Sequence, residues 1–268
     1  MGVRTLVMGI LNVTPDSFSD GGRFPDADAA VQHGLRLMAE GADIVDVGGE
    51  SSRPGASPVP EDEEIRRVVP VVERLAREPG AVVSVDTCKA RVAEEAVAAG
   101  ALVINDISAL RADPRMAEVA ARTGAGVVLM HMKGTPRDMQ DNPVYGDVVG
   151  EIAAFLAERG EVARKAGVPA EAIAYDPGIG FGKTPAHNLE LIRRLAEFRG
   201  LGGPLLVGPS RKSFIGAVLN LPPSERLEGT AAAVALAIAG GADVVRVHDV
   251  GAMVRVAKVA DAVVRGLA

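Results

Sequence analysis

The chain has 268 residues, 48% of them hydrophobic and 3% aromatic, with a formal net charge of −6 and a single cysteine. One cysteine excludes an intrachain disulfide and a multi-cysteine metal site, and the mildly acidic balance argues against a nucleic-acid partner. No apolar run reaches the roughly 18 residues that cross a bilayer, and we expect no signal peptide. These features predict a cytoplasmic protein without a nucleic-acid or membrane partner.

Short apolar runs rich in β-branched residues recur along the chain, and each is followed by a polar or glycine-rich break. The runs are Thr5–Leu11, Asp43–Val47, Val82–Val85, Leu102–Ile104, Gly126–Met130, Ala172–Tyr175, Leu205–Val207 and Val244–Val247. Continuous apolar runs of this kind indicate parallel strands that are buried on both faces.

Helical patterns with apolar spacing near 3.6 separate these strands. The clearest are Asp28–Glu40, Glu61–Arg77, Lys89–Ala99, Val148–Ala166 and Val250–Arg265, and left-handed helix ends are expected at Gly41, Gly100, Gly167 and Gly241. Eight strand-helix units in about 260 residues favour a (β/α)8 TIM barrel of the α/β class, with residues 1–268 as one domain. A doubly wound open sheet stays an alternative, although it usually brings a dinucleotide or P-loop signature.

The segment 174–184 ends a strand at Asp176 and continues as a glycine-rich loop. It is not a P-loop, because Gly178 and Gly182 enclose three residues where that motif needs four. The dinucleotide fingerprint also misses by one residue. What remains is a carboxylate followed by a backbone that can approach a flat ligand closely.

Polar or glycine-rich groups follow every predicted strand, and in a barrel these strand ends form the active site. They are Asn12, the 48–53 loop, Asp86, Asn105 with Asp106, His131, Asp176, the 208–212 segment, and Arg246 with His248. Such convergence indicates a ligand site and not a core. The first two of these connections are long and rich in Gly, Pro and Ser, so they are predicted to be mobile lids.

Seven motifs in register resemble the dihydropteroate synthases over essentially the whole chain. They are Met8–Gly22, Asp46–Ala56, Val85–Ala90, Asn105–Ser108, Asp176–Lys183, Ser210–Ser213 and Arg246–Asp249. The resemblance implies a transferase of folate biosynthesis that is a sulfonamide target. Its reaction joins 6-hydroxymethyl-7,8-dihydropterin diphosphate to 4-aminobenzoate and releases diphosphate by a dissociative displacement.

The same resemblance implies roles for individual residues. The pterin would be bound by Asp86, Asn105, Ile107, Met130, Asp176, Phe181, Gly208, Lys212 and Arg246. The diphosphate would be bound by Asn12, Ser52, Arg246 and His248, with Mg²⁺ on Asn12. The aminobenzoate would be bound by Phe18, Arg53, Pro54, Lys212 and Ser213. The catalytic residues would be Asp20, Lys212 and Arg53. Ser52 departs from the threonine that the family usually places there, but it keeps the hydroxyl.

The family also implies a homodimer formed through the last two helices, and the apolar segments Ala231–Ala239 and Val250–Val264 fit that arrangement.

Simpler interpretations accompany several of these residues. Asp86 and Asp176 could be helix N-caps, the commonest role of Asp after a strand. His131 is ambiguous and is not assigned to the site. Lys183 and Thr184 are interpreted as helix-start residues before Pro185.

The Glu61–Glu64 run is interpreted as the acidic first turn of a helix. Cys88 is interpreted as a free, partly buried thiol, because no base is paired with it.

Two rival functions remain. Methyltetrahydrofolate-to-corrinoid methyltransferases share the pterin floor, but they need neither the first lid, nor Ser210–Ser213, nor a phosphate grip at Arg246 and His248. The other rival is a catalytically silent paralogue that only binds a pterin or serves as an assembly subunit. Such a protein would have lost lid or phosphate residues, and none is missing.

Overall fold

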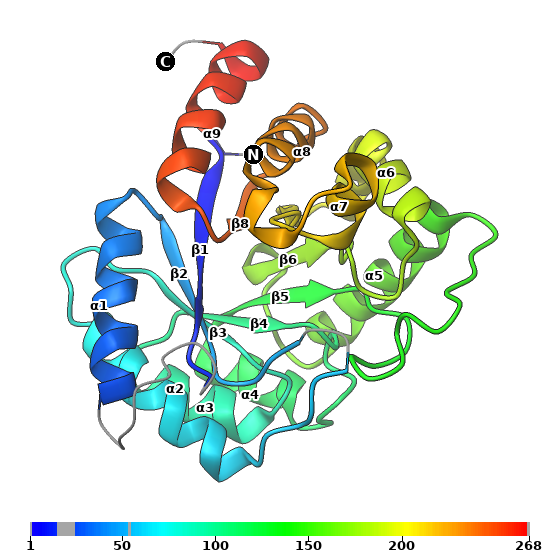
Figure 1. Ribbon diagram of the computed structural model, residues 1–268. Helices are drawn as coiled ribbons and strands as arrows, with labels where there is room; N and C mark the ends of the chain where they lie inside the picture. The colour runs from blue at the N-terminus through cyan, green and yellow to red at the C-terminus, as the bar shows by residue number, and fades with distance from the viewer. Residues whose placement is uncertain (1, 15–24, 53–54, 267–268) are drawn as a thin grey trace.

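The computed structural model describes residues 2–14, 25–52 and 55–266, and in it eight parallel strands form a nearly closed barrel (Figure 1). The strands are β1 (Leu6–Asn12), β2 (Ile44–Gly48), β3 (Val83–Asp86), β4 (Val103–Asp106), β5 (Gly126–Met130), β6 (Ile173–Asp176), β7 (Leu206–Val207) and β8 (Val244–Val247). Each predicted apolar run has become one of these strands, so the (β/α)8 barrel is confirmed and the open sheet is excluded.

The strands pair in the order β6-β5-β4-β3-β2-β1-β8-β7, which leaves β6 and β7 at the seam. Two contacts join that seam: a parallel bridge between Tyr175 and Leu205, and a 2.8 Å hydrogen bond from the Tyr175 N–H to the carbonyl of Pro204. β7 is only two residues long. The barrel therefore closes through fewer backbone contacts here than between its other strands.

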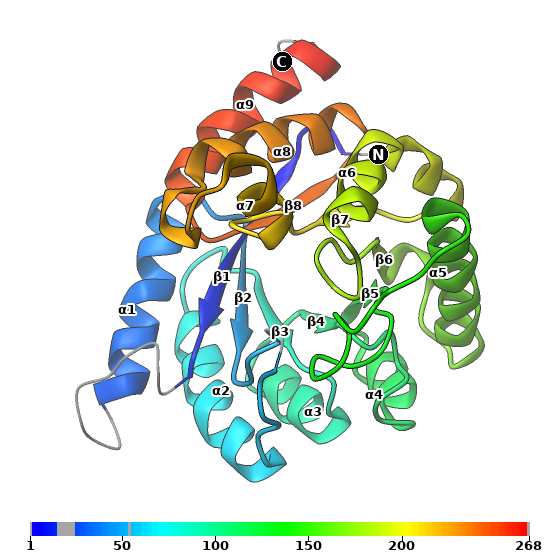
Figure 2. The same ribbon diagram turned by 45° about the vertical axis from the view of Figure 1, so that its right-hand side comes forward.

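Helices surround the strands on the outside (Figure 2). They are α1 (Pro25–Ala39), α2 (Glu61–Leu75), α3 (Ala90–Ala98), α4 (Met116–Thr123), α5 (Val148–Lys165), α6 (Pro185–Arg193), α7 (Ser213–Leu219), α8 (Leu227–Ala239) and α9 (Val250–Arg265). The five predicted helical patterns correspond to α1, α2, α3, α5 and α9. α4 and α7, which the patterns did not reveal, have only eight and seven residues. Segments so short span about two turns and show little periodicity.

Local chain chemistry explains where several helices begin and end. The four predicted end glycines all have positive φ, from 98° at Gly241 to 113° at Gly100, as a left-handed end requires. Thr184 caps α6 in a capping box with His187, and Pro185 follows at the first helical position. The predicted start of α6 is confirmed. No helix in the described ranges is long and apolar enough to cross a membrane.

The barrel interior consists of two different layers. Its lower layer is a buried apolar cluster of Met8, Ile44, Val128, Leu206 and Val244. Because side chains on a strand alternate with period two, the next inward positions on these strands lie one layer nearer the carboxyl ends. Those positions are Ile10, Asp46, Met130, Gly208 and Arg246, and they begin the mouth of the barrel.

Candidate active site

A charged network spans the mouth between β8, β2, β3 and β4. The Arg246 guanidinium donates through Nε to Asp46 Oδ2 at 2.6 Å and through a terminal nitrogen to Asp86 Oδ2 at 2.7 Å. Asn105 Nδ2 donates to the same Asp46 oxygen at 2.9 Å. The plane of the guanidinium is thus fixed by two carboxylates from two strands, and the Asn105 amide is oriented by one of them.

The Asp46 carboxylate is fully buried. Its Oδ1 has no hydrogen-bond partner in the described part of the chain, although Oδ2 has two. Desolvation is the main cause that raises the pKa of Asp86, to about 7; Arg246 opposes the shift and Asp46 adds to it. The mouth therefore contains a carboxyl group that titrates near neutrality.

Asp176 lies across the mouth at the end of β6 and is 6% exposed. Its Oδ1 accepts a 2.7 Å hydrogen bond from the N–H of Gly178. Burial raises the pKa of Asp176, and the neighbouring Lys212 ammonium opposes that shift. Asp86 and Asp176 are not helix caps, because α3 is capped at Lys89 and α6 at Thr184.

The glycine-rich loop after Asp176 passes directly against the chain that follows β5. Gly178 and Gly182 have φ of 70° and 63°, and a Cβ atom on them would lie 1.9 Å from the His131 carbonyl oxygen and 2.4 Å from that of Lys133. These glycines are required by contacts with the protein itself. Their passage beside a bound ring stays a prediction.

Lys212 enters the mouth from the segment after β7. Its Nζ donates to the carbonyl of Ile179 and lies 4.4 Å from the centroid of the Phe181 ring. Burial is the main cause that lowers the pKa of Lys212, to about 8. The preceding Arg211 has φ of 57°, and its Nε donates to Asp249 at 2.9 Å. This left-handed residue, fixed by its ion pair, turns the chain so that Lys212 faces inward.

Apolar side chains gather on the β4–β6 side of the mouth. Met130, Met132 and Met139 form a buried cluster, and Ile107 and Phe181 pack against it. The structure therefore brings together the three residues that the sequence predicted as apolar walls, Ile107, Met130 and Phe181.

Gly208, at the end of β7, faces Arg246 and Lys212. A Cβ atom added there would lie 3.7 Å from Arg246 Cβ and 4.0 Å from Lys212 Nζ, which are ordinary contacts. The protein itself does not require glycine at this position. A ligand that approached the backbone closely would require glycine there.

Three of the residues predicted for the diphosphate, Asn12, Arg246 and His248, lie on the β1 and β8 side. Asn12 pairs with Gly48 at the end of β1. The His248 N–H donates to Ser210 Oγ at 3.2 Å, and its ring Nδ1 lies 2.9 Å from the same oxygen. Ser213, predicted to contact the aminobenzoate, is exposed in the first turn of α7.

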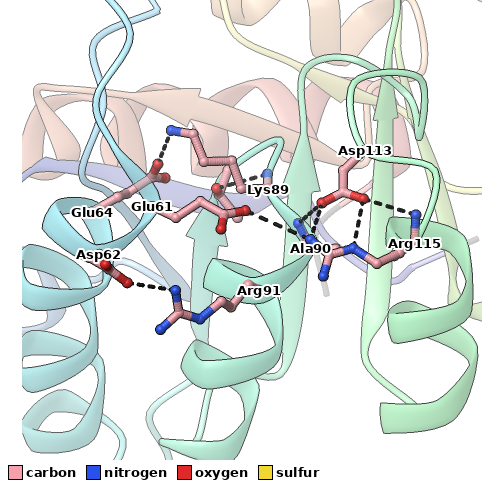
Figure 3. A network of polar contacts seen from close by, with 9 residues as sticks. Glu61, Asp62, Glu64, Lys89, Ala90, Arg91, Asp113 and Arg115 are labelled. Carbon is pink, nitrogen blue, oxygen red and sulfur yellow. Dashed lines mark hydrogen bonds and ion pairs between the residues drawn. The ribbon is translucent and has the colours of Figure 1, made fainter.

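The base of the loop after β2 is held by a partly buried ion cluster. Lys89 Nζ contacts Glu50 Oε2 at 2.5 Å and also pairs with Glu64, whose side chain is 1% exposed. Glu50 Oε2 also accepts a 2.8 Å hydrogen bond from Val59 N–H across the loop. Figure 3 shows the Lys89–Glu64 pair and, near it, the Arg91–Asp62 pair. Both pairs join α2 to the start of α3. Ser52, predicted to bind diphosphate, follows this anchored base and is half-buried.

Helix α2 does begin with four acidic residues, so the predicted acidic first turn is confirmed. The burial and pairing of Glu64 were not anticipated.

Several predicted residues lie outside the described ranges, and their roles stay predictions. They are Phe18, Asp20, Arg53 and Pro54.

Among the described residues no group of three or more His, Cys, Asp or Glu side chains could hold a metal ion. Cys88 is a free, half-buried thiol, as predicted, and burial is the main cause that raises its pKa.

Sequence reasoning gave no individual site role to three residues that make contacts in or beside the mouth: Asp46, Ser210 and Lys183. Asp46 lies inside an apolar run, where a carboxylate is costly unless it is paired, and that was the available signal.

Asp106 proves to be structural. Its carboxylate accepts hydrogen bonds from Ser108 N–H, Ser108 Oγ and Leu110 N–H at 2.6–2.7 Å.

The fold and this mouth together define a barrel enzyme that binds its ligand at the carboxyl ends of the strands. A model of the pterin binding enzymes matches residues 8–248. A dihydropteroate synthase from Synechocystis is 50% identical over 265 residues, which is 98% of this chain and 92% of the relative.

Solved structures agree with this match. The Yersinia pestis dihydropteroate synthase, solved with a sulfonamide drug complex, superposes with a TM-score of 0.92 at 47% identity, covering 98% of this chain and 96% of that one. The Xanthomonas albilineans synthase with 4-aminobenzoic acid gives 0.91 at 50% identity, covering 97% and 93%. The chain belongs to the pterin-binding enzyme family.

Proposed function

We propose that this chain, as a dihydropteroate synthase, joins 6-hydroxymethyl-7,8-dihydropterin diphosphate to 4-aminobenzoate by a dissociative displacement at the methylene carbon. The overall reaction is the alkyl transfer of the synthases to which it is about half identical over nearly its full length. The observation that carries the proposal is the convergence of polar groups at one mouth. Arg246 binds Asp86 directly and shares Asp46 with Asn105, and its charge acts on Asp176. The corrinoid methyltransferase alternative does not require the Ser210–His248 contact that this mouth contains.

Binding of the pterin ring follows from the polar groups that face it. The Asp176 and Asp86 carboxylates and the Asn105 amide match a heterocycle edge that carries several N–H groups. A ring with a mismatched edge would leave these buried groups unpaired, at about 1–3 kcal/mol each. Lys212 would lie on the carbonyl and N5 side of the ring. The Arg246 guanidinium, held in one plane by Asp46 and Asp86, would offer a stacking surface. Ile107, Met130 and Phe181 exclude water from the other side.

Departure of the diphosphate separates charge, and the residues around the ring determine how easily that happens. The electron-rich pterin delocalises the cation that is left on the methylene carbon. His248, Ser52 and Arg246 would hold the leaving anion. Asn12 would hold Mg²⁺, which neutralises charge on the diphosphate. The described residues offer no carboxylate cage, so a metal bound largely through phosphate and water fits the donor set.

The aminobenzoate would then attack from the loop side, against Phe18, Arg53, Pro54 and Ser213, with Asp20 stabilising the developing cation. The sulfonamide and the 4-aminobenzoic acid bound to the Yersinia and Xanthomonas synthases support an aryl amine site of this kind. Sulfonamide binding at the same place is part of the proposal.

We also propose a cytoplasmic, single-domain protein that forms a homodimer through α8 and α9. The two helices pack together, and they expose Leu236, Val259 and Val263 by 60%, 68% and 81%. Apolar side chains this exposed on adjacent helices suit an interface between two copies. A monomeric mass in light scattering at micromolar concentration would remove the dimer from the proposal.

The activity test is incubation with the pterin diphosphate, Mg²⁺ and 4-aminobenzoate. The expected products are 7,8-dihydropteroate and diphosphate, and finding neither would overturn the enzymatic claim. For the binding site, Asp176→Asn should abolish pterin binding measured by calorimetry. Undiminished affinity would remove Asp176 from the pocket.

A further inference from the structure

A buried lysine lies behind the glycine-rich loop and is not accounted for by the proposed reaction. The Lys183 side chain is 3% exposed. Its Nζ lies 3.0 Å from His131 Nδ1 and donates to the carbonyl oxygens of Phe181 at 2.9 Å and His131 at 3.3 Å. An ammonium has three N–H donors, and here all three have an acceptor.

His131 completes this arrangement at the end of β5. Its Nδ1 can accept from an ammonium only if the imidazole is neutral and carries its proton on Nε2. Burial is the main cause that lowers the pKa of His131, to about 2, and the charges of Lys183, Arg111 and Lys133 contribute. Its backbone N–H donates to the carbonyl of Asp176 at 3.0 Å. One histidine thus connects the buried lysine to the predicted pterin-binding residue.

The buried cation needs a compensating charge. Burial lowers the pKa of Lys183, and Asp176 is the group that opposes this shift, while Lys212 adds to it. Burial raises the pKa of Asp176, and the cations opposing that shift are Lys212, Lys183 and Arg246. Lys212 approaches from the segment after β7 and Arg246 from β8, whereas Lys183 approaches from the loop that follows Asp176 itself. Gly178, whose N–H donates to Asp176 Oδ1, lies beside this lysine, because a Cβ atom on Gly178 would be 3.3 Å from Lys183 Nζ.

We propose that Lys183 is a positioning residue for Asp176, because its ammonium fixes the glycine-rich loop to His131 and supplies positive charge behind the carboxylate that binds the pterin. Lys183 does not touch the substrate. It keeps Asp176 ionised in a buried site and holds Phe181, whose carbonyl it binds, at the apolar wall. The inference rests on the proposed binding of the pterin by Asp176.

The test measures the affinity for 6-hydroxymethyl-7,8-dihydropterin diphosphate by calorimetry from about pH 5 to about pH 9. The variants are Lys183→Met, which removes the charge and the donors, and Lys183→Gln, which removes the charge but keeps an amide donor. The control is Lys133→Met. Lys133 carries the same charge beside the same loop, but its side chain is exposed and its ammonium lies 4.3 Å from the Tyr145 ring centroid.

Both Lys183 variants are expected to bind the pterin about tenfold more weakly at neutral pH, and the pH at which affinity is half lost should rise by about one unit. The sign follows because loss of a nearby cation raises the pKa of Asp176, so the carboxylate forms only at higher pH. Lys133→Met should stay within about twofold of wild type. A residue that only stabilised the fold would lower the melting temperature and leave that midpoint in place.

Two outcomes would overturn the inference. One is a folded Lys183→Gln protein whose affinity is half lost at the same pH as in the wild type. This result would overturn the inference even if the Lys183→Met variant does not fold. The other comes from ¹⁵N-histidine spectra of the unmodified protein. One of its four histidines should stay neutral, with an unprotonated Nδ1, down to about pH 5. Four histidines with ordinary titrations would contradict the His131–Lys183 geometry.

The failure of this inference differs from the failure of the proposed pocket. If Asp176→Asn keeps its pterin affinity, the pocket itself is wrong. If Asp176→Asn loses affinity while both Lys183 variants bind as wild type does at every pH, only the role of Lys183 is wrong.

Discussion

The two inner layers of the barrel use the same strands for different purposes. In the lower layer Ile44 and Val244 pack with their neighbours in a closed apolar cluster. Two residues further along the same strands, Asp46 and Arg246 form an ion pair whose carboxylate is fully buried. Asp46 Oδ1 lacks a hydrogen-bond partner among the described residues. Apolar packing gains stability at little cost, whereas a buried charge pair gains little net stability. We therefore attribute the charges of the upper layer to the ligand binding that is proposed for it.

The largest expected effect comes from breaking the charged layer and sparing the apolar one. Asp46→Ala leaves Arg246 with one carboxylate and Asn105 without its acceptor. We expect the unfolding free energy to fall by about 3–5 kcal/mol and pterin affinity to fall at least about a hundredfold. Ile44→Val, two residues away, should cost about 0.5–1.5 kcal/mol and leave affinity unchanged. Urea denaturation measures the unfolding free energies and calorimetry measures the pterin affinities. Equal losses of affinity in the two variants would contradict the idea that only the upper layer binds the ligand.

The converse variant is Met8→Ala in the lower layer, where Met8 is 1% exposed. The cavity should lower the unfolding free energy by about 2–5 kcal/mol. The kcat per folded molecule should be unchanged, because no residue of the mouth is altered. A raised KM for the pterin diphosphate at a temperature well below unfolding would show that the layers are coupled.

The pH dependence of stability sharpens the same contrast. The folded pKa of Asp86, raised to about 7 mainly by burial, lies above the unfolded value, so the native state binds more protons between about pH 4 and pH 7. Stability without ligand should thus fall as pH rises through that window, by at most about 1.4 kcal/mol per pH unit from this group. Asp86→Asn should flatten the slope in urea titrations. An unchanged slope would assign the proton to another buried carboxyl group, since burial also raises the pKa of Asp176 and of Asp106.

The smallest effect on folding is expected at Gly208. Gly208→Ala meets only ordinary contacts with Arg246 and Lys212, so the unfolding free energy should change by less than about 0.5 kcal/mol. The KM for the pterin diphosphate should nevertheless rise about tenfold, because the methyl group occupies space that the ligand needs. Gly180→Ala is a contrasting control: its φ is 83° and its Cβ would lie 2.7 Å from Lys212, so it should lower stability as well.

Much of the fold was predictable because parallel strands buried on both faces produce continuous apolar runs, and all eight appeared where those runs stand. Short helices such as α4 were missed because about two turns carry too little periodicity. Within the mouth, Asp86, Asn105 and Asp176 were found because each follows a strand. Asp46 was missed because it lies one layer inside. The pairing of Lys183 with His131 joins residues 52 positions apart, a distance over which local sequence carries no signal.

The seam between β6 and β7 has a consequence for how the barrel behaves when it is loaded. Asp176 ends one strand of the seam, and Gly208 and Lys212 follow the other. A pterin bound as proposed would therefore span the joint of the barrel wall that has the fewest backbone contacts. The bound substrate would then connect two strands that few hydrogen bonds join. Amide hydrogen exchange at Tyr175 and Leu206 should slow more on pterin binding than exchange between β1 and β2, since a ligand that binds only the closed barrel stabilises it by mass action.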